Sequence, residues 1–115
     1  MLRLLRARSE IVLGIDRYLH RQSGSVEQFK AVAILIDGTR LHINEVWVQG
    51  ELVKYAYYHL NPRGHILHGW DNAPHHPEIS TYPHHCHRSN RVEPSKVRSL
   101  NDVLDILSAM LMGDT

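Results

Sequence analysis

The stretch Phe29-Lys-Ala-Val-Ala-Ile-Leu-Ile-Asp-Gly-Thr-Arg-Leu-His-Ile-Asn-Glu-Val-Trp-Val48 decides the fold of this 115-residue chain. It contains two runs rich in β-branched and aromatic residues, which favour strands, on either side of a short polar turn. The dipeptide Asp37-Gly38 suits the positive φ angles of a tight hairpin turn. We therefore predict that the runs 29–36 and 40–48 pair as antiparallel strands.

Two more β-rich runs follow at short, regular intervals. The run 52–60 ends at Asn61-Pro-Arg-Gly64, whose proline and glycine suit a type I turn, and the last run spans 65–70. Links as short as these allow only antiparallel neighbours. The middle of the chain is therefore predicted to be a four-stranded antiparallel meander.

Helices are predicted at both ends of the chain. Between Leu2 and His20 apolar residues recur at helical spacing, with arginines mostly on the other side. Ser99 and Asp102 form a capping-box pattern at the start of a second helix that ends near Gly113. Its apolar face consists of Leu100, Val103, Leu104, Leu107, Met110 and Leu111. We expect one α+β domain over residues 1–115: an N-terminal helix, a four-stranded meander, a long loop and a C-terminal helix.

The long loop is the segment 71–94, which has neither helical nor strand periodicity and contains several prolines. A loop of this length inside a compact domain is usually functional or disordered. Six of the ten histidines of the chain lie in it or just before it: His68, His75, His76, His84, His85 and His87. This concentration of imidazoles makes the loop the candidate functional site.

One use of the loop is acid–base cleavage of RNA without a metal. Histidine titrates near pH ~6.5, so one imidazole can act as base while another, protonated, acts as acid. Asp71 would orient a ring, and Arg88, Arg91 or Lys54 would bind phosphate. Tyr58 would stack on or position RNA. The acid–base candidates are the five histidines His75, His76, His84, His85 and His87.

A second use is a metal site, because neutral imidazole is a common ligand of zinc and nickel. His85 and His87 can chelate from one extended segment. Asp71, Glu78 or His75 would complete the shell. The helical His-Glu-x-x-His pattern of zinc hydrolases is absent from the sequence. A third use is a protein-interaction loop without catalytic activity, and our preferred interpretation needs no cofactor.

Composition narrows the class of protein further. Thirteen Lys and Arg against twelve Asp and Glu give a net charge of +1, and 43% hydrophobic residues are typical of a globular protein. The single cysteine, Cys86, excludes a disulfide within the chain. Charged residues interrupt every apolar stretch near the N-terminus, so we expect neither a signal peptide nor a membrane span, and we predict a cytoplasmic protein.

The chain resembles the TumE family of small prokaryotic toxins. The likeness lies in Tyr57-x-x-x-x-x-x-Gly64, in Asp71-Asn-Ala-Pro-His-His-Pro-Glu78 and in Pro83-His-His-x-His87, and it extends over roughly residues 30–111. The resemblance implies the toxin half of a toxin–antitoxin module, with a small helix-turn-helix antitoxin as partner and RNA as target; it leaves a homodimer open. In relatives we expect a basic residue shortly before the Asp-Asn-Ala-Pro element, where this chain has His68 and Gly69.

Overall fold

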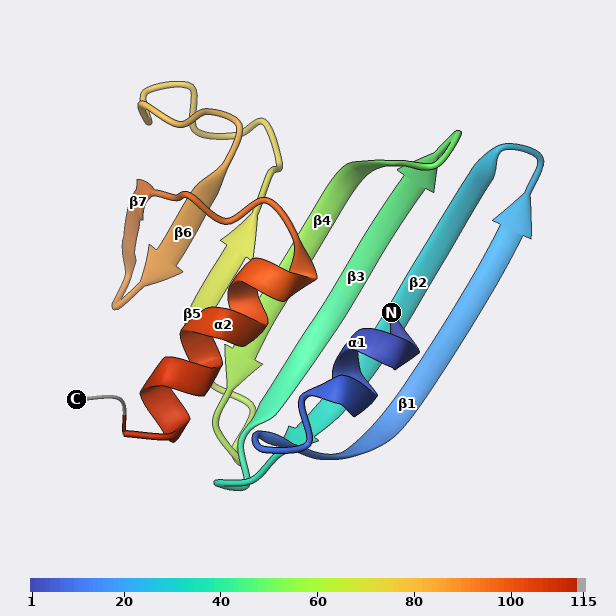
Figure 1. Cartoon of the computed structure of the whole chain (residues 1–115). Helices are drawn as coiled ribbons and strands as arrows, with labels where there is room; N and C mark the ends of the chain where they lie inside the picture. Colours follow the sequence, from blue (N-terminus) through green and yellow to red (C-terminus); the bar gives the residue numbers. More distant parts are fainter. Residues whose placement is uncertain (114–115) are drawn as a thin grey trace.

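The computed structural model describes residues 1–113 as a seven-stranded antiparallel sheet with two helices on one face (Figure 1). Each strand pairs with the next one along the chain. The elements are α1 (Leu2–Ala7), β1 (Val12–Ser23), β2 (Val26–Leu35), β3 (Arg40–Val48), β4 (Glu51–Leu60), β5 (Ile66–Asp71), β6 (His85–Arg88), β7 (Arg91–Pro94) and α2 (Leu100–Leu111). The prediction of four strands is therefore wrong. The predicted domain 1–115 also includes residues 114–115, which lie outside the described part.

The predicted N-terminal helix is mostly a strand. Only Leu2–Ala7 is helical, and Val12–Ser23 pairs with β2 over its whole length. Register shifts between Val12 and Gly14 and between Ile15 and Arg17 add residues to β1. After each extra residue, the side chains that point to a given face of the sheet are displaced by one position along the strand. Apolar residues in β1 consequently recur three or four positions apart, as they do in a helix.

The predicted loop contains a hairpin of two short strands, β6 and β7. Its turn residues Ser89 and Asn90 have φ angles of 48° and 62°, the left-handed conformation that a two-residue hairpin turn requires at both positions. β6 pairs with β5 as well, so the hairpin extends the sheet. The prolines of the segment led us to expect a loop, but Pro94 is the last residue of edge strand β7, where a missing N–H is tolerated.

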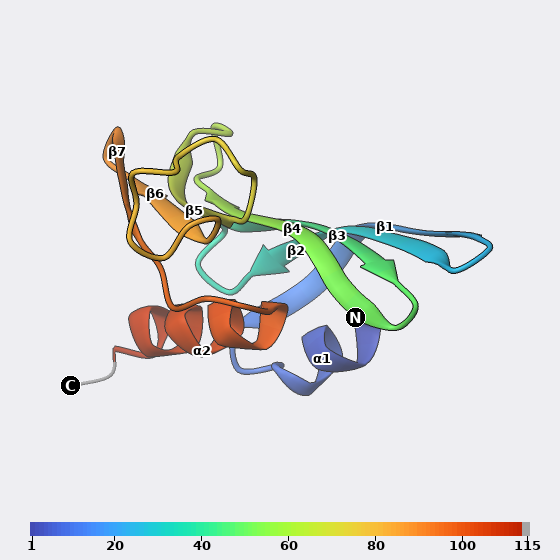
Figure 2. The same ribbon diagram turned by 90° about the horizontal axis from the view of Figure 1, so that it is seen from above.

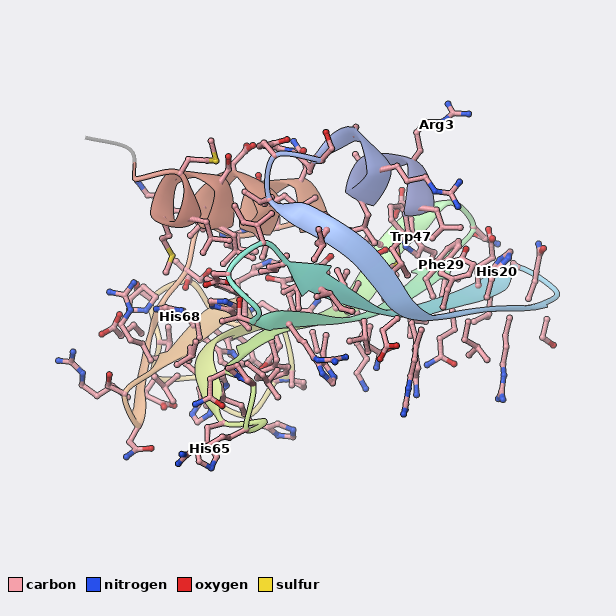
Figure 3. The ribbon with its side chains drawn as sticks, turned by 90° about the horizontal axis from the view of Figure 1, so that it is seen from below. Arg3, His20, Phe29, Trp47, His65 and His68 are labelled. Atoms are coloured by element: carbon pink, nitrogen blue, oxygen red, sulfur yellow. The ribbon has the colours of Figure 1, made fainter. Side chains whose placement is uncertain are left out.

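Both helices pack on the same face of the sheet and leave the opposite face without a helix (Figure 2). Leu5 of α1 and Leu104 of α2 are fully buried against this covered face. The sheet contributes alternate residues of its central strands to the same core: Ala31, Ala33, Leu35, Leu41, Ile43, Tyr55 and Tyr57. In Figure 3 Phe29 and Trp47 lie on the helix side, and His65 lies on the other. We call the side without helices the open face.

The C-terminal helix α2 confirms the sequence prediction at its N-terminus. The Ser99 side chain accepts a hydrogen bond from the Asp102 N–H, and the Asp102 carboxylate accepts one from the Arg98 N–H at 2.8 Å. Of the predicted apolar face, Leu100, Val103, Leu104 and Leu107 are buried, while Met110 is exposed. None of the helices in the described residues is long and apolar enough to cross a membrane.

A buried histidine in β4 couples the stability of the fold to pH. The Thr39 hydroxyl donates to Asp37 at 2.5 Å, so it accepts the bond of 2.8 Å from Nε2 of His59. The other ring nitrogen of His59 faces Nδ1 of His68 at 3.5 Å. Burial lowers the pKa of His59, the neighbouring His68 lowers it further, and the Asp37 carboxylate opposes them. The folded protein therefore holds His59 neutral at pH values where the unfolded chain is protonated.

We predict that the free energy of unfolding falls as the pH falls from about 6.5 towards the lowered pKa of His59, because only the unfolded chain binds the proton there. His59→Gln should make this decrease smaller. His65→Gln is the matched control, because His65 is exposed. Urea titrations of both variants between about pH 7.5 and pH 5.5 measure the effect. Equal pH dependence in the two variants would contradict the assignment.

Candidate functional site

The candidate site lies on the open face, where β4, β5 and β6 run side by side. The antiparallel register sets Asp71 opposite His85. Two pairs further along, Tyr58 is opposite Gly69, which in turn is opposite His87. Alternate residues of a strand share a face, so the register brings the Tyr58, Asp71, His85 and His87 side chains to the same side of the sheet.

The carboxylate of Asp71 is the centre of the site and is only 6% exposed. Its Oδ1 lies 2.8 Å from His85 Nε2 and accepts a hydrogen bond from the Ala73 N–H at 3.0 Å. Its Oδ2 accepts a hydrogen bond from the Tyr58 hydroxyl at 2.7 Å and lies 3.2 Å from His87 Nε2. The predicted orienting role of Asp71 thus has a geometric basis, since one carboxylate contacts two imidazoles.

The buried ring of His85 has an acceptor at each nitrogen. Nδ1 lies 2.9 Å from the carbonyl oxygen of Pro83, and Nε2 lies 2.8 Å from Asp71. A carbonyl oxygen can only accept, so Nδ1 carries a hydrogen, and Nε2 faces the Asp71 carboxylate. His85 and Asp71 therefore form a buried pair whose close contacts hold both side chains in place.

The segment 72–84 rises over the open face, on the side away from the helices, and adds a third histidine (Figure 2). The ring centroid of His76 lies 5.0 Å from that of His85 and 6.0 Å from that of His87. His76 Nδ1 donates to Glu78 at 3.2 Å. The side chains of His76 and His87 are 30% and 34% exposed, so both rings are accessible to a ligand.

Tyr58 reaches Asp71 because its ring lies across a glycine. A Cβ atom added to Gly69 would overlap the Tyr58 ring. Burial raises the pKa of Tyr58, and the hydrogen bond to Asp71 raises it further, so the hydroxyl remains a donor. Gly69 stands where we expected a basic residue in relatives, and in this chain the position makes room for an aromatic ring.

Two of the predicted histidines lie away from the cluster. His84 alternates to the covered face, where its Nδ1 donates to the Tyr55 hydroxyl at 2.6 Å, and that hydroxyl donates to the Val97 carbonyl at 2.9 Å. Burial lowers the pKa of His84, and the positive charges of Arg98 and His85 lower it further. His75 is exposed in the loop. His84 thus attaches the end of the loop to the core through its hydrogen bond with Tyr55.

The predicted phosphate ligands lie at the rim of the site. Arg88 alternates away from His87 in β6 and pairs with Arg91 in the hairpin, and both residues form part of the lining of a pocket of about 400 Å³. His87 and Tyr58 line the same pocket. Lys54 is exposed in β4 at some distance along the strand. Arg88 and Arg91 thus border the pocket that His87 lines, and Lys54 does not.

Sequence reasoning missed Gly69 and the Pro83 carbonyl as parts of the site. It also did not separate His84 from its neighbours. The spacing His85-x-His87 could have separated these two histidines from His84. It puts both rings on one face of the sheet once residues 85–88 are recognised as a strand. The antiparallel pairing with β5 then selects Asp71.

His76, His85 and His87 are also the described residues that could hold a metal ion. They offer nitrogen atoms within 4.8 Å of one another, whereas two nitrogens on one zinc ion lie no more than about 4.2 Å apart. Small ring movements would bring them together. His85 would then have to release either Asp71 or the Pro83 carbonyl, so the present arrangement suits hydrogen bonding better.

The fold and the site define a small α+β protein that carries a histidine–aspartate cluster on the open face of a one-sided sheet. The model of the family described as "Toxin TumE" matches residues 1–111. The chain therefore belongs to the TumE family of toxins. It is the toxin of a toxin–antitoxin system and has a cognate antitoxin as partner. No curated protein and no solved structure matches the chain.

We predict that Gly69→Ala weakens the growth arrest caused by the toxin, because the new methyl group pushes the Tyr58 ring away from Asp71. Loss of a hydrogen bond to a buried charge should also cost about 1–3 kcal/mol of stability. Gly14→Ala is the matched control: Gly14 also lies in a strand, and an added Cβ there has no atom within 4 Å. Growth after induction and thermal unfolding are the measurements. Unaltered arrest with Gly69→Ala would show that the position of Tyr58 does not matter.

Proposed function

We propose that this toxin is an endoribonuclease that cleaves RNA by acid–base chemistry, without a metal. The observation that carries the proposal is the pair of accessible imidazoles, His76 and His87, whose ring centroids lie 6.0 Å apart above a buried Asp71–His85 pair. RNA cleavage requires a base for the 2′-hydroxyl and an acid for the leaving 5′-oxygen. Two rings at this separation can act on the two sides of one phosphodiester.

The hydrogen bonds assign the roles. Nε2 of His87 lies 3.2 Å from Asp71, so in this proposal Nε2 carries the hydrogen and Nδ1 accepts the proton. Nδ1 of His76 donates to Glu78, which leaves the Nε2 side of that ring to face the leaving oxygen. We therefore assign His87 as the base and His76 as the acid. Asp71 and His85 act as positioning residues.

The reaction then balances without a cofactor. His87 takes the proton of the 2′-hydroxyl, the 2′-oxygen forms a bond to phosphorus, and the bond from phosphorus to the 5′-oxygen breaks. His76 gives its proton to the leaving oxygen. The products are a 2′,3′-cyclic phosphate and a 5′-hydroxyl end. Arg88 and Arg91, in the pocket beside His87, stabilise the negative charge that develops on the phosphoryl oxygens.

The double variant His76→Gln/His87→Gln should relieve growth arrest and lower the cleavage rate in vitro by about 10²–10⁴-fold for each group removed. His75→Gln is the control, because this ring is exposed in the same loop. Circular dichroism checks that the variants are folded. Full toxicity in the double variant, with His75→Gln behaving alike, would refute the assignment of the two histidines.

A second candidate function is metal binding by His76, His85 and His87, which the proximity of their nitrogen atoms favours. Removal of metal by EDTA separates the two candidates. We predict that purified toxin without a histidine tag cleaves RNA at the same rate before and after EDTA. Added zinc should inhibit, because it would occupy the nitrogens that transfer protons. Stoichiometric metal in the purified protein, with loss of activity on chelation, would favour the second candidate instead.

The cognate antitoxin is, in this proposal, a small helix-turn-helix protein encoded next to the toxin, and the toxin acts in the cytoplasm. Both points rest on the family membership of the chain. A neighbouring gene that encodes such a protein and restores growth on co-expression would support the first point. The sequence leaves a homodimer open, and light scattering of the purified toxin tests for it.

A further inference from the structure

A basic groove crosses the open face of the sheet and ends at the candidate site. Its volume is about 910 Å³, and Tyr58 forms part of its lining as well as part of the pocket beside His87. The other lining residues come from the first four strands: Asp16, Arg17, Tyr18, Leu19, Arg21, Lys30, Ala31, Val32, His42, Ile43, Asn44 and Ala56. The groove is therefore continuous with the histidine cluster through one shared side chain.

The cross-strand register aligns the groove with the site. One row of paired residues runs from Arg17 in β1 through His42 in β3 to Tyr58 in β4. The next row runs from Lys30 in β2 to Asp71 in β5. Strands lie about 4.8 Å apart, so three steps from β1 to β4 span about 14 Å. A chain bound along these rows leads directly to the Asp71–His87 cluster.

The charge of the groove is unlike that of the whole chain. The chain has a net charge of +1, yet the groove holds the cations Arg17, Arg21 and Lys30. Within the described lining the one acid is Asp16, which Arg40 neutralises through an ion pair of 2.8 Å. The groove thus attracts anions, and its cations lie on β1 and β2, at the end away from the histidine cluster.

We propose that this groove binds single-stranded RNA and leads it to the histidine cluster. Cations on β1 and β2 attract phosphates, and Tyr58, which lines both the groove and the pocket beside His87, offers an aromatic ring near the site on which a base can stack. An open β-sheet with aromatic and basic side chains is a common platform for single strands. The inference rests on the proposed function, since it names the path by which the substrate reaches the site.

Binding is tested separately from cleavage, in a chain that carries His87→Gln. A fluorescent single-stranded RNA is titrated against this protein and against the same protein with Arg17→Glu/Lys30→Glu; both positions are exposed. We expect affinity to fall at least tenfold. Loss of two phosphate contacts should also flatten the plot of log K against log salt by about 1.4. Arg3→Glu/Arg63→Glu is the control, because it makes the same change of charge at exposed positions outside the groove lining.

The outcomes distinguish RNA binding in the groove from RNA cleavage at the histidine cluster. Loss of RNA binding in the groove variant alone supports the inference, even if the toxin proves unable to cleave RNA. Equal affinities in the groove variant and the control overturn it, even if the histidine variants confirm cleavage. A polyglutamate peptide of matched charge serves as competitor. If it displaces RNA from the groove at equal concentration, the groove is a site for an acidic protein partner and the assignment to RNA is wrong.

Discussion

Burial of only one face of the sheet is the constraint on which the rest of this structure depends. The two helices α1 and α2 are short and lie on the same side (Figure 2). Because side chains alternate along a strand, this choice assigns every position of the central strands to a core or to an open face. Tyr57 then enters the core, and its neighbour Tyr58 enters the site. A shift of one residue in the register would exchange the two roles.

The buried pair of Asp71 and His85 contributes more to position than to stability. Moving two charges out of water costs free energy that their attraction largely offsets but rarely exceeds. The chain satisfies the remaining polar groups of this pair with the Tyr58 hydroxyl and the Pro83 carbonyl. Such a network holds its members in one arrangement. We interpret it as the reason that His87, which contacts the same carboxylate, keeps one nitrogen directed to Asp71.

The parts predicted correctly from the sequence are those where local pattern and tertiary environment agree. Strand β3 and the cap of α2 are examples, because a half-buried strand and a capped amphipathic helix each have a clear period. The prediction was wrong at the two ends of the sheet. In β1 every residue from Asp16 to Ser23 is exposed, so no alternation marks the strand, and its bulges imitate the spacing of a helix. In β6 four residues are too few to establish a period.

The candidate site could likewise be predicted only in part from the sequence. Histidine content located the segment, but composition cannot tell His84 from His85, because adjacent residues differ only in the face they occupy. That face is set by the pairing of β5 with β6, a contact between segments separated by the whole histidine-rich loop. A contact between Asp71 and a histidine could be predicted from the sequence, because a carboxylate directly before a run of histidines has few other partners.

The basic residues of β1 admit two explanations that the structure helps to separate. An edge strand presents unpaired backbone groups, and charged side chains such as Arg17 and Arg21 discourage another chain from pairing with it. This protective role would require no particular face of the sheet. Lys30, however, lies in β2, which has strands on both sides and no free edge to protect. Defence of the edge does not account for an exposed cation there, whereas the proposed RNA path, in the row that leads to Asp71, does.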